Sequence, residues 1–238
     1  MKKSTVKFIS VIITFALALV FVVRFGTPSL LQSYVRFGIG DCRSIPVFCM
    51  VPVSCASITE AGWGSSFDPM PYFSENLAAS VPRGFTVVEE ILSRPFYKKH
   101  KRMDKGNVVY LLRKDKGFFP GLFPQLKASG VSDDYEFIRR VMNAKIAGIR
   151  NLTDTFFVIM KGVFIPDLGN QANVKMCAVE LEGMKGFINY NLGDKDNLFD
   201  CNFIGRDGSF YKVYIKDREK RLGLAEVEAV VASLRSKN

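Results

Sequence analysis

The sequence predicts an α+β fold in which an antiparallel β-sheet is flanked by helices. The clearest strand pattern covers residues 209–216, where side chains alternate between two faces after a tight Asp207-Gly208 turn. Amphipathic helices are predicted after Ser132 and from Leu224. Because strands, a helix, more strands and a final helix follow one another along the chain, we expect helices to cover the faces of an antiparallel sheet.

The elements of this domain, expected over residues 72–238, begin with short strands. Runs over 77–81 and 85–91 lie on either side of a Pro82-Arg83-Gly84 turn, and 107–113 is a third strand. The first helix is predicted to have Ser132 as its N-cap and to stop near Gly148. Four strand-like runs then cover 155–165, 174–181, 185–191 and 198–204, before the strand over 209–216 and the final helix.

Residues 1–24 are predicted to form a signal-anchor. Three lysines precede an uncharged apolar run over residues 8–23, which as a helix spans roughly 24 Å, somewhat less than a hydrocarbon core of about 30 Å. The basic residues before the run favour a cytoplasmic N-terminus and an extracytoplasmic domain in a bacterial-type inner membrane. A cleaved signal peptide, which would give a secreted protein, and a buried core helix are the alternatives; Val22-Val23-Arg24 lacks the small residues of a cleavage site.

Residues 25–71 are predicted to connect this anchor to the domain. Glycine and proline recur too often there for long regular elements. The region is also too apolar for a flexible linker. We therefore expect part of it to lie on the membrane surface or to pack on the domain.

The basic charge of the chain is local. The net charge is +10, and outside the signal-anchor (residues 1–24) the chain has 29 basic and 23 acidic residues. The segment over 98–116 by itself supplies this remaining excess of +6. A basic chain can bind nucleic acid, but the predicted extracytoplasmic location argues against that partner.

Five cysteines indicate disulfide bonding in an oxidising compartment. Cys42, Cys49 and Cys55 have no common zinc or iron–sulfur spacing, so we predict a local disulfide and neither a metal nor a cofactor. Cys177 and Cys201 fall in separate strand-like runs, where buried thiols, a cross-strand bridge and redox chemistry are the alternatives. The odd number leaves at least one thiol free or bonded to another chain.

Hydrolytic catalysis is not predicted. His100 is the single histidine, and it lies among basic neighbours that disfavour its protonated form. Most Ser-His and Cys-His catalytic arrangements would depend on this one residue. No catalytic residue is therefore assigned.

The candidate binding surface is a basic-aromatic segment in which cations are followed by phenylalanines among turn residues. It resembles a surface-insertion loop, whose rings enter a bilayer interface while each lysine contributes about 1 kcal/mol with anionic head groups. It is equally suited to docking a protein partner, and the alternative is that its rings fill the domain core. Its candidate binding residues are Lys98, Lys99, Lys101, Arg102, Arg113, Lys114, Lys116, Phe118, Phe119 and Phe123.

Over residues 72–236 the chain resembles the Mog1/PsbP-like family of α/β/α sandwiches. The resemblance rests on the strand that runs into Val81-Pro82-Arg83-Gly84-Phe85, the antiparallel hairpins, and the closing helix that ends Val231-Ala232-Ser233-Leu234-Arg235. It implies an assembly or adaptor role without catalysis, and no cofactor-binding residue carries over. The predicted function is a membrane-anchored extracytoplasmic module that binds a protein partner or a lipid surface. The alternative is a thiol-dependent redox protein or enzyme that uses one of the five cysteines.

Overall fold

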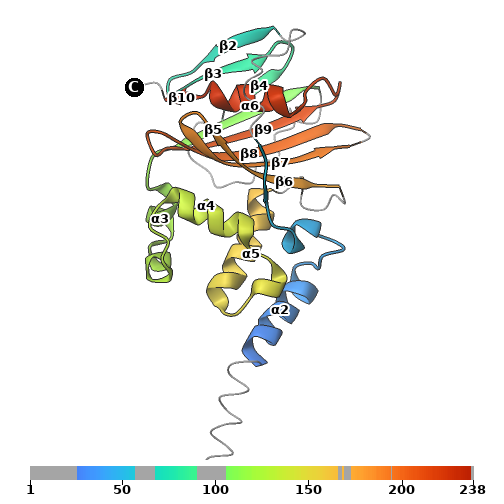
Figure 1. Cartoon of the computed structure of the whole chain (residues 1–238), viewed down its shortest axis with the longest axis vertical. Helices are drawn as coiled ribbons and strands as arrows, with labels where there is room; N and C mark the ends of the chain where they lie inside the picture. The colour runs from blue at the N-terminus through green and yellow to red at the C-terminus, as the bar shows by residue number, and fades with distance from the viewer. Residues whose placement is uncertain are drawn as a thin grey trace, which may run out of the picture.

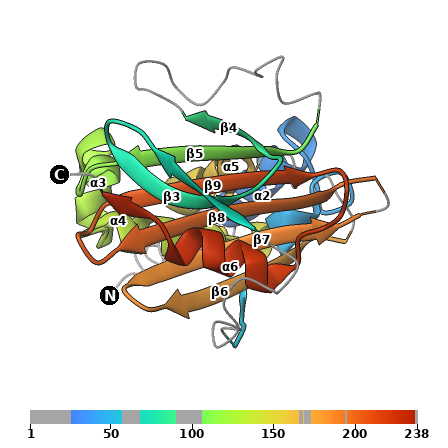
Figure 2. The same ribbon diagram turned by 90° about the horizontal axis from the view of Figure 1, so that it is seen from above.

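The α+β fold class predicted from the sequence is confirmed. A computed structural model describes residues 26–56, 68–89, 106–165, 168, 173–193 and 195–236. A seven-stranded sheet carries α3, α4 and α5 on one face, and α6 with a three-stranded sheet on the other (Figure 1). The small sheet and α6 lie side by side across the large sheet (Figure 2).

The elements have the following bounds. The strands are β1 (Val53–Ser54), β2 (Pro69–Phe73), β3 (Leu77–Pro82), β4 (Thr86–Glu89), β5 (Val108–Lys114), β6 (Lys175–Leu181), β7 (Met184–Leu192), β8 (Asn197–Gly205), β9 (Phe210–Asp217) and β10 (Arg235–Ser236). The α-helices are α2 (Thr27–Gly38), α3 (Phe118–Leu122), α4 (Asp134–Asn143), α5 (Leu152–Phe164) and α6 (Leu224–Ala232). Short 3₁₀ turns are η2 (Pro46–Cys49), η3 (Pro124–Ser129) and η4 (Ile146–Gly148).

The large sheet is mixed, whereas a purely antiparallel sheet was expected. Its order is β1-β6-β7-β8-β9-β5-β4, and the five central strands are antiparallel. The two outer pairs, β1 with β6 and β4 with β5, are parallel. Parallel neighbours need a long connection, and the chain supplies one over residues 90–107 between β4 and β5.

The two strands around the turn at 82–84 belong to different sheets. β3 pairs with β2 and β10 in the small sheet, while β4 is an edge of the large one. Glu89 of β4 joins the two sheets, because Tyr72 Oη donates to its Oε2 at 2.7 Å and Ser74 Oγ donates to its Oε1 at 2.9 Å. Burial, followed by the bond to Glu89, raises the pKa of Tyr72 to about 12.

The prediction of a strand over 155–165 is wrong, because helix α5 contains all of this run except Ile165, its C-cap. Asn151 is the N-cap, and its side chain accepts a hydrogen bond from the backbone N–H of Asp154. The run Phe156-Phe157-Val158-Ile159 has the β-branched and aromatic content of a strand. A continuous apolar run does not distinguish a buried strand from a buried helix, and the cap decides the outcome here.

Helix α4 begins one residue later and ends earlier than predicted. Its N-cap is Asp133, which accepts from the N–H of Glu136 at 2.8 Å, and not Ser132. The helix ends at Asn143, so Ile146 and Ile149 are buried from the following 3₁₀ turn and from the residue after it. Asp133 is favoured over Ser132 as the N-cap because its carboxylate also interacts with the positive end of the helix dipole.

Part of the connecting region packs on the domain, which is one of the two expected alternatives, and its described residues include a regular helix that was not predicted. Helix α2 has twelve residues and starts with Pro28 in its first turn, where proline is tolerated. Val35, Val47 and Phe48 from this region are fully buried in the core beneath the helical layer. Gly162 lets Phe48 approach α5, since a Cβ there would lie 3.1 Å from the ring.

Two apolar cores lie on the two faces of the large sheet. The alternation predicted in β9 is confirmed: Phe210 and Tyr214 belong to the core under α4 and α5, while Tyr211 and Val213 belong to the core under α6. Helix α6 is also confirmed, and its Val231 is buried.

Candidate functional site

The predicted basic-aromatic segment does not form one exposed surface in the part of the chain that the structure describes. Arg113 Nη1 lies 2.9 Å from Asp115 Oδ1 in an ion pair. Lys114 Nζ lies 5.4 Å from the centre of the Phe118 ring. Lys116 is exposed. The other four predicted cations lie outside the described residues: Lys98, Lys99, Lys101 and Arg102.

The phenylalanines of this segment point inward, so the core alternative holds for them. Phe119 is 1% exposed, stacks on Phe137 at 4.5 Å between ring centres, and meets Phe210 edge-on at 5.1 Å. Phe123 is partly buried and stacks on Phe137 at 5.6 Å, and Phe118 packs against the same core. A buried ring cannot enter a bilayer from the domain surface, so the surface-insertion hypothesis is wrong for Phe119.

Asp134 fixes this segment in place. Its side chain is 2% exposed, and it accepts from the N–H of Gly117 at 2.5 Å and of Phe119 at 2.7 Å. Helix α3 therefore receives its N-terminal carboxylate from α4. Asp134 therefore lies at the N-termini of two helices, α4 and α3.

The cysteines form two disulfides and leave one buried thiol. Cys42 pairs with Cys49, with a Cα–Cα distance of 5.6 Å, which confirms the local disulfide. Cys55 pairs with Cys177 at 5.4 Å and ties the connecting region to β6. The possible Cys177–Cys201 bridge is wrong, because Ile188 of β7 lies between them in register.

The remaining thiol, Cys201, is fully buried under α6. Burial raises its pKa well above the ordinary range, and the negative charge of Asp200 acts in the same direction. Reactive thiols need a lowered pKa and access to solvent. The environment of Cys201 therefore does not favour thiol chemistry.

Helix α2 presents an apolar stripe to solvent. Leu30, Tyr34 and Phe37 recur at helical spacing and are 71%, 61% and 89% exposed. The opposite face of the helix packs on the helical layer through buried Val35. α2 lies at one end of the long axis, and it begins directly after Gly26, the first residue that the structure describes (Figure 1).

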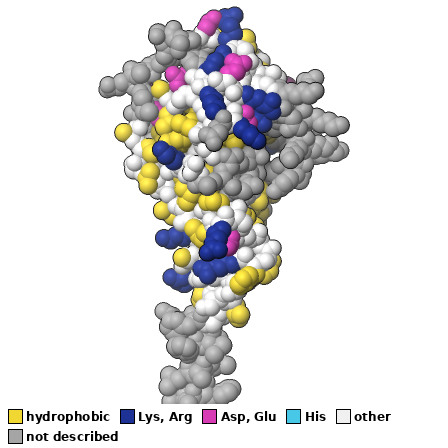
Figure 3. Space-filling view, turned by 90° about the vertical axis from the view of Figure 1, so that its right-hand side faces the viewer, with side chains coloured by type: hydrophobic (Ala, Val, Ile, Leu, Met, Phe, Trp, Pro, Cys, Tyr) yellow, Lys and Arg dark blue, Asp and Glu magenta, His cyan; other side chains and the backbone are white. Residues whose placement is uncertain are grey.

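Cations lie on the same part of the molecule as this apolar stripe. Arg36 is on α2, Arg43 follows it, and Lys145 and Arg150 flank η4, which contacts α2. All four side chains are exposed. Apolar and basic side chains gather at this end of the described surface (Figure 3). Such a combination is typical of elements that lie in a bilayer interface.

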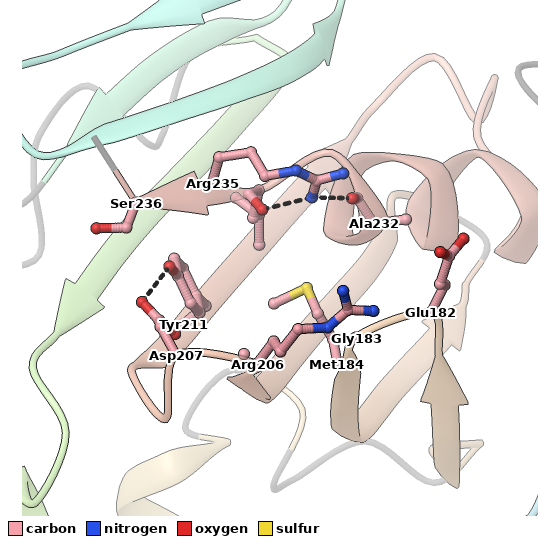
Figure 4. Close-up of a pocket in the computed structure, with 11 residues that line it drawn as sticks. Glu182, Gly183, Met184, Arg206, Asp207, Tyr211, Ala232, Arg235 and Ser236 are labelled. Carbon is pink, nitrogen blue, oxygen red and sulfur yellow. Dashed lines mark hydrogen bonds between the residues drawn. The ribbon is translucent and has the colours of Figure 1, made fainter. Parts of the chain in front are cut away.

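A cavity of about 420 Å³ opens on the other face of the sheet, where three separate segments meet. They are the turn between β6 and β7 (182–184), the turn between β8 and β9 (205–207), and the end of α6 with β10 (232–236). Met184, Tyr211 and Leu234 make an apolar floor, since each is almost fully buried. Arg206 and Arg235 lie on opposite sides of Met184 in the view of Figure 4.

No family model, curated protein or solved structure matches this chain.

Within the described residues, none of the helices has both the length and the hydropathy needed to cross a bilayer. The predicted signal-anchor, with its apolar run over 8–23, lies outside the described residues, as does His100. No group of three or more His, Cys, Asp or Glu side chains is arranged to hold a metal ion in the described ranges.

A buried ion pair lies between the sheet and the helical layer. Lys212 Nζ contacts both carboxylate oxygens of Asp200, at 3.0 and 2.9 Å, and also donates to the backbone carbonyl of Phe164 at the end of α5. Asn202 donates to Asp200 Oδ1 at 2.7 Å. The cation therefore joins the sheet to a helix C-terminus, where positive charge is favourable.

Lys161 is a second buried cation that the sequence did not single out. Its Nζ donates to the carbonyl oxygens of Met50 at 2.7 Å and Ala144 at 2.9 Å, which fastens the connecting region to α5. Burial lowers the pKa of Lys161 to about 7. A lysine inside the run over 155–165 is the signal that would have marked this position.

We expect this lysine to make stability depend on pH. Because its pKa is about 7 when folded against an ordinary 10.5, the unfolded chain binds more protons between these values. The free energy of unfolding should therefore rise with pH across this window, by at most about 1.4 kcal/mol per pH unit. Chemical denaturation from pH 6.5 to 9.5 measures the slope.

Lys161→Met should flatten that slope, and exposed Lys145→Met is the matched control. The two carbonyls that lose a donor lower stability at every pH, so only the slope is diagnostic. Parallel curves for the wild type and Lys161→Met would show that Lys161 stays protonated when buried.

Proposed function

We propose that this protein is a membrane-anchored, extracytoplasmic binding or assembly module without catalytic chemistry. The apolar run over residues 8–23 crosses the bilayer, and α2 lies in the interface beside it. The observation that carries the proposal is the exposed stripe of Leu30, Tyr34 and Phe37. This stripe follows the apolar run closely in sequence, since only Arg24 and Phe25 separate the end of the run from Gly26. An apolar stripe beside a membrane anchor and among cations is well suited to lipid head groups and the upper acyl chains.

Two observations support the extracytoplasmic location and the non-catalytic role. The disulfides Cys42–Cys49 and Cys55–Cys177 are typical of proteins in oxidising compartments. The fifth cysteine is buried with a raised pKa, which argues against the thiol-dependent alternative. The Mog1/PsbP-like resemblance favours the same assembly role and stays part of this proposal.

The lipid contact is proposed for α2 in place of the phenylalanines of α3. With α2 at the bilayer, the helical layer faces the membrane. The cavity, on the opposite face of the sheet, is then turned away from the lipid and is accessible to a ligand or partner. A binding role needs such an exposed site.

Depth-dependent fluorescence quenching tests this arrangement on the full chain in vesicles. Trp63 is the single tryptophan, so Trp63→Phe gives a silent background. Phe37→Trp in that background should be quenched severalfold more by lipids brominated near the head group than by lipids brominated at the chain ends. The ring is 89% exposed, and interfacial aromatic rings lie at head-group depth.

Phe73→Trp is the matched control, because Phe73 is 67% exposed on β2 at the other end of the molecule. It should be quenched by neither lipid. Equal, weak quenching at both positions would overturn the contact between α2 and lipid. Release of the full chain from membranes by an alkaline wash would overturn the anchor itself.

A further inference from the structure

We propose that the cavity between α6 and the hairpin turns binds a carboxylate that carries an apolar group. This inference rests on the binding role proposed above and names its ligand chemistry. The cavity volume of about 420 Å³ falls within the range of about 300–1,000 Å³ for small-ligand sites. The source of the carboxylate is either the C-terminal residue of a peptide or a free short-chain acid.

Arg206 is an exposed side chain that lines the cavity and lies against the β6–β7 turn. A Cβ at Gly183 would lie 3.2 Å from Nε and Nη2 of Arg206, so the guanidinium packs closely on this glycine. Gly183 also has φ of +76°, which favours glycine. Arg206 forms no ion pair with a carboxylate of the described residues, so its donors are available to a ligand.

The second arginine is Arg235, the first residue of β10, whose guanidinium is oriented by backbone carbonyls at and just after the end of α6. Its Nη1 donates to the carbonyls of Ala232 and Leu234, the latter at 2.7 Å. The backbone of Arg235 is fixed as well, because β10 pairs with Ala78 of β3. Nε and Nη2 are not used in these bonds. A guanidinium that is already oriented loses less entropy when it binds an anion.

The acidic neighbours limit the ligand to a single negative charge. Asp207 is turned to the protein, accepting from the N–H of Ser209 at 2.9 Å and from Tyr211 Oη at 3.3 Å. Glu182 lies at the mouth of the cavity and is exposed. A dianion such as phosphate would be repelled by these two carboxylates more strongly than a monoanion, and a monoanion can bind the guanidinium groups that line the cavity.

The apolar floor accounts for the rest of the ligand. Met184 comes from β7, Tyr211 from β9 and Leu234 from the link between α6 and β10, and all three line the cavity. Methionine adapts its shape to apolar groups of different form. A ligand with the carboxylate at the rim and an aliphatic group below fits both surfaces.

Methyl NMR of the full chain, labelled at methionine, gives a direct reading at the site. The chain has eight methionines, and Met184→Leu assigns the signal. N-acetyl-leucine should shift the Met184 methyl signal saturably, while N-acetyl-leucinamide, which lacks the carboxylate, should not. Hexanoate represents the free short-chain acid, and N-acetyl-leucine represents the C-terminal residue of a peptide. The probe with the lower dissociation constant identifies the source of the carboxylate.

Arg206→Gln and Arg235→Gln should each weaken N-acetyl-leucine binding about tenfold or more, because each removes a hydrogen bond to a charged group. The Lys variants should retain part of the affinity. Arg139→Gln, an exposed arginine on α4, is the matched control and should bind normally.

Equal shifts with the acid and its amide, or unchanged affinity in both Gln variants, would overturn the proposal. Tighter binding of inorganic phosphate would overturn it too. These outcomes are separable from failure of the proposed function, because the Met184 signal needs no lipid contact and the quenching at position 37 needs no ligand.

Discussion

Replacing Cys55 and Cys177 by alanine should lower the free energy of unfolding by about 5 kcal/mol. The bridge joins residues 122 apart, and cross-linking so long a loop strongly restricts the unfolded chain. In the native state β1 is only two residues long and contributes little to holding the arm on β6. Denaturant unfolding without reductant measures the difference.

The matched control is the pair Cys42→Ala and Cys49→Ala. Its bridge spans only 7 residues, so the same model gives about 2.5 kcal/mol. Equal losses for the two pairs would show that chain entropy does not govern the effect.

In the wild type, alkylation after unfolding should label one thiol, Cys201, and labelling of more would contradict the pairing.

Phe119→Ala should lower the free energy of unfolding by about 3–5 kcal/mol. The ring is fully buried and packs on Phe137, Phe164 and Phe210, which come from two helices and a strand. Removing it leaves a cavity where three elements meet, and rigid neighbours collapse only partly into such a space. Thermal and chemical unfolding both report this loss.

The control is Leu122→Ala on the same short helix, where the side chain is 52% exposed. Its cost should stay within about 0.5 kcal/mol. A small effect at Phe119, together with weaker vesicle binding, would restore the surface-insertion hypothesis for this segment. The two positions therefore separate a core role from a lipid-binding role.

Local signals predicted much of the sheet. The strand pattern over 209–216, the Asp207-Gly208 turn and the helix from Leu224 appear where the sequence indicates them. Each depends on neighbours within a few residues, such as a two-residue alternation or a positive φ at Gly208. The strand prediction over 155–165 failed because it relied on the same kind of local signal. The composition of this run suits either a buried strand or a buried helix, and only the N-cap, Asn151, distinguishes them.

The candidate sites were less predictable. The cations and phenylalanines of the basic-aromatic segment are adjacent in sequence, yet Asp134 of a neighbouring helix turns Phe119 into the core. The apolar residues of α2 could be read from the sequence. Their exposure could not, because it depends on the helix packing on the domain through the face that carries Val35. The cavity had no sequence signal, since its walls come from three segments far apart in the chain.

The sequence by itself determined the α+β class, the uncharged apolar run over 8–23, the strand alternation and the presence of disulfides, because these depend on residue type and short-range spacing. The tertiary structure decided that Cys55 pairs with Cys177, that Phe119 is buried while Phe37 is exposed, and that Arg206 and Arg235 line one cavity. Those outcomes depend on which distant segments share a core, and burial against a partner many residues away leaves no local pattern.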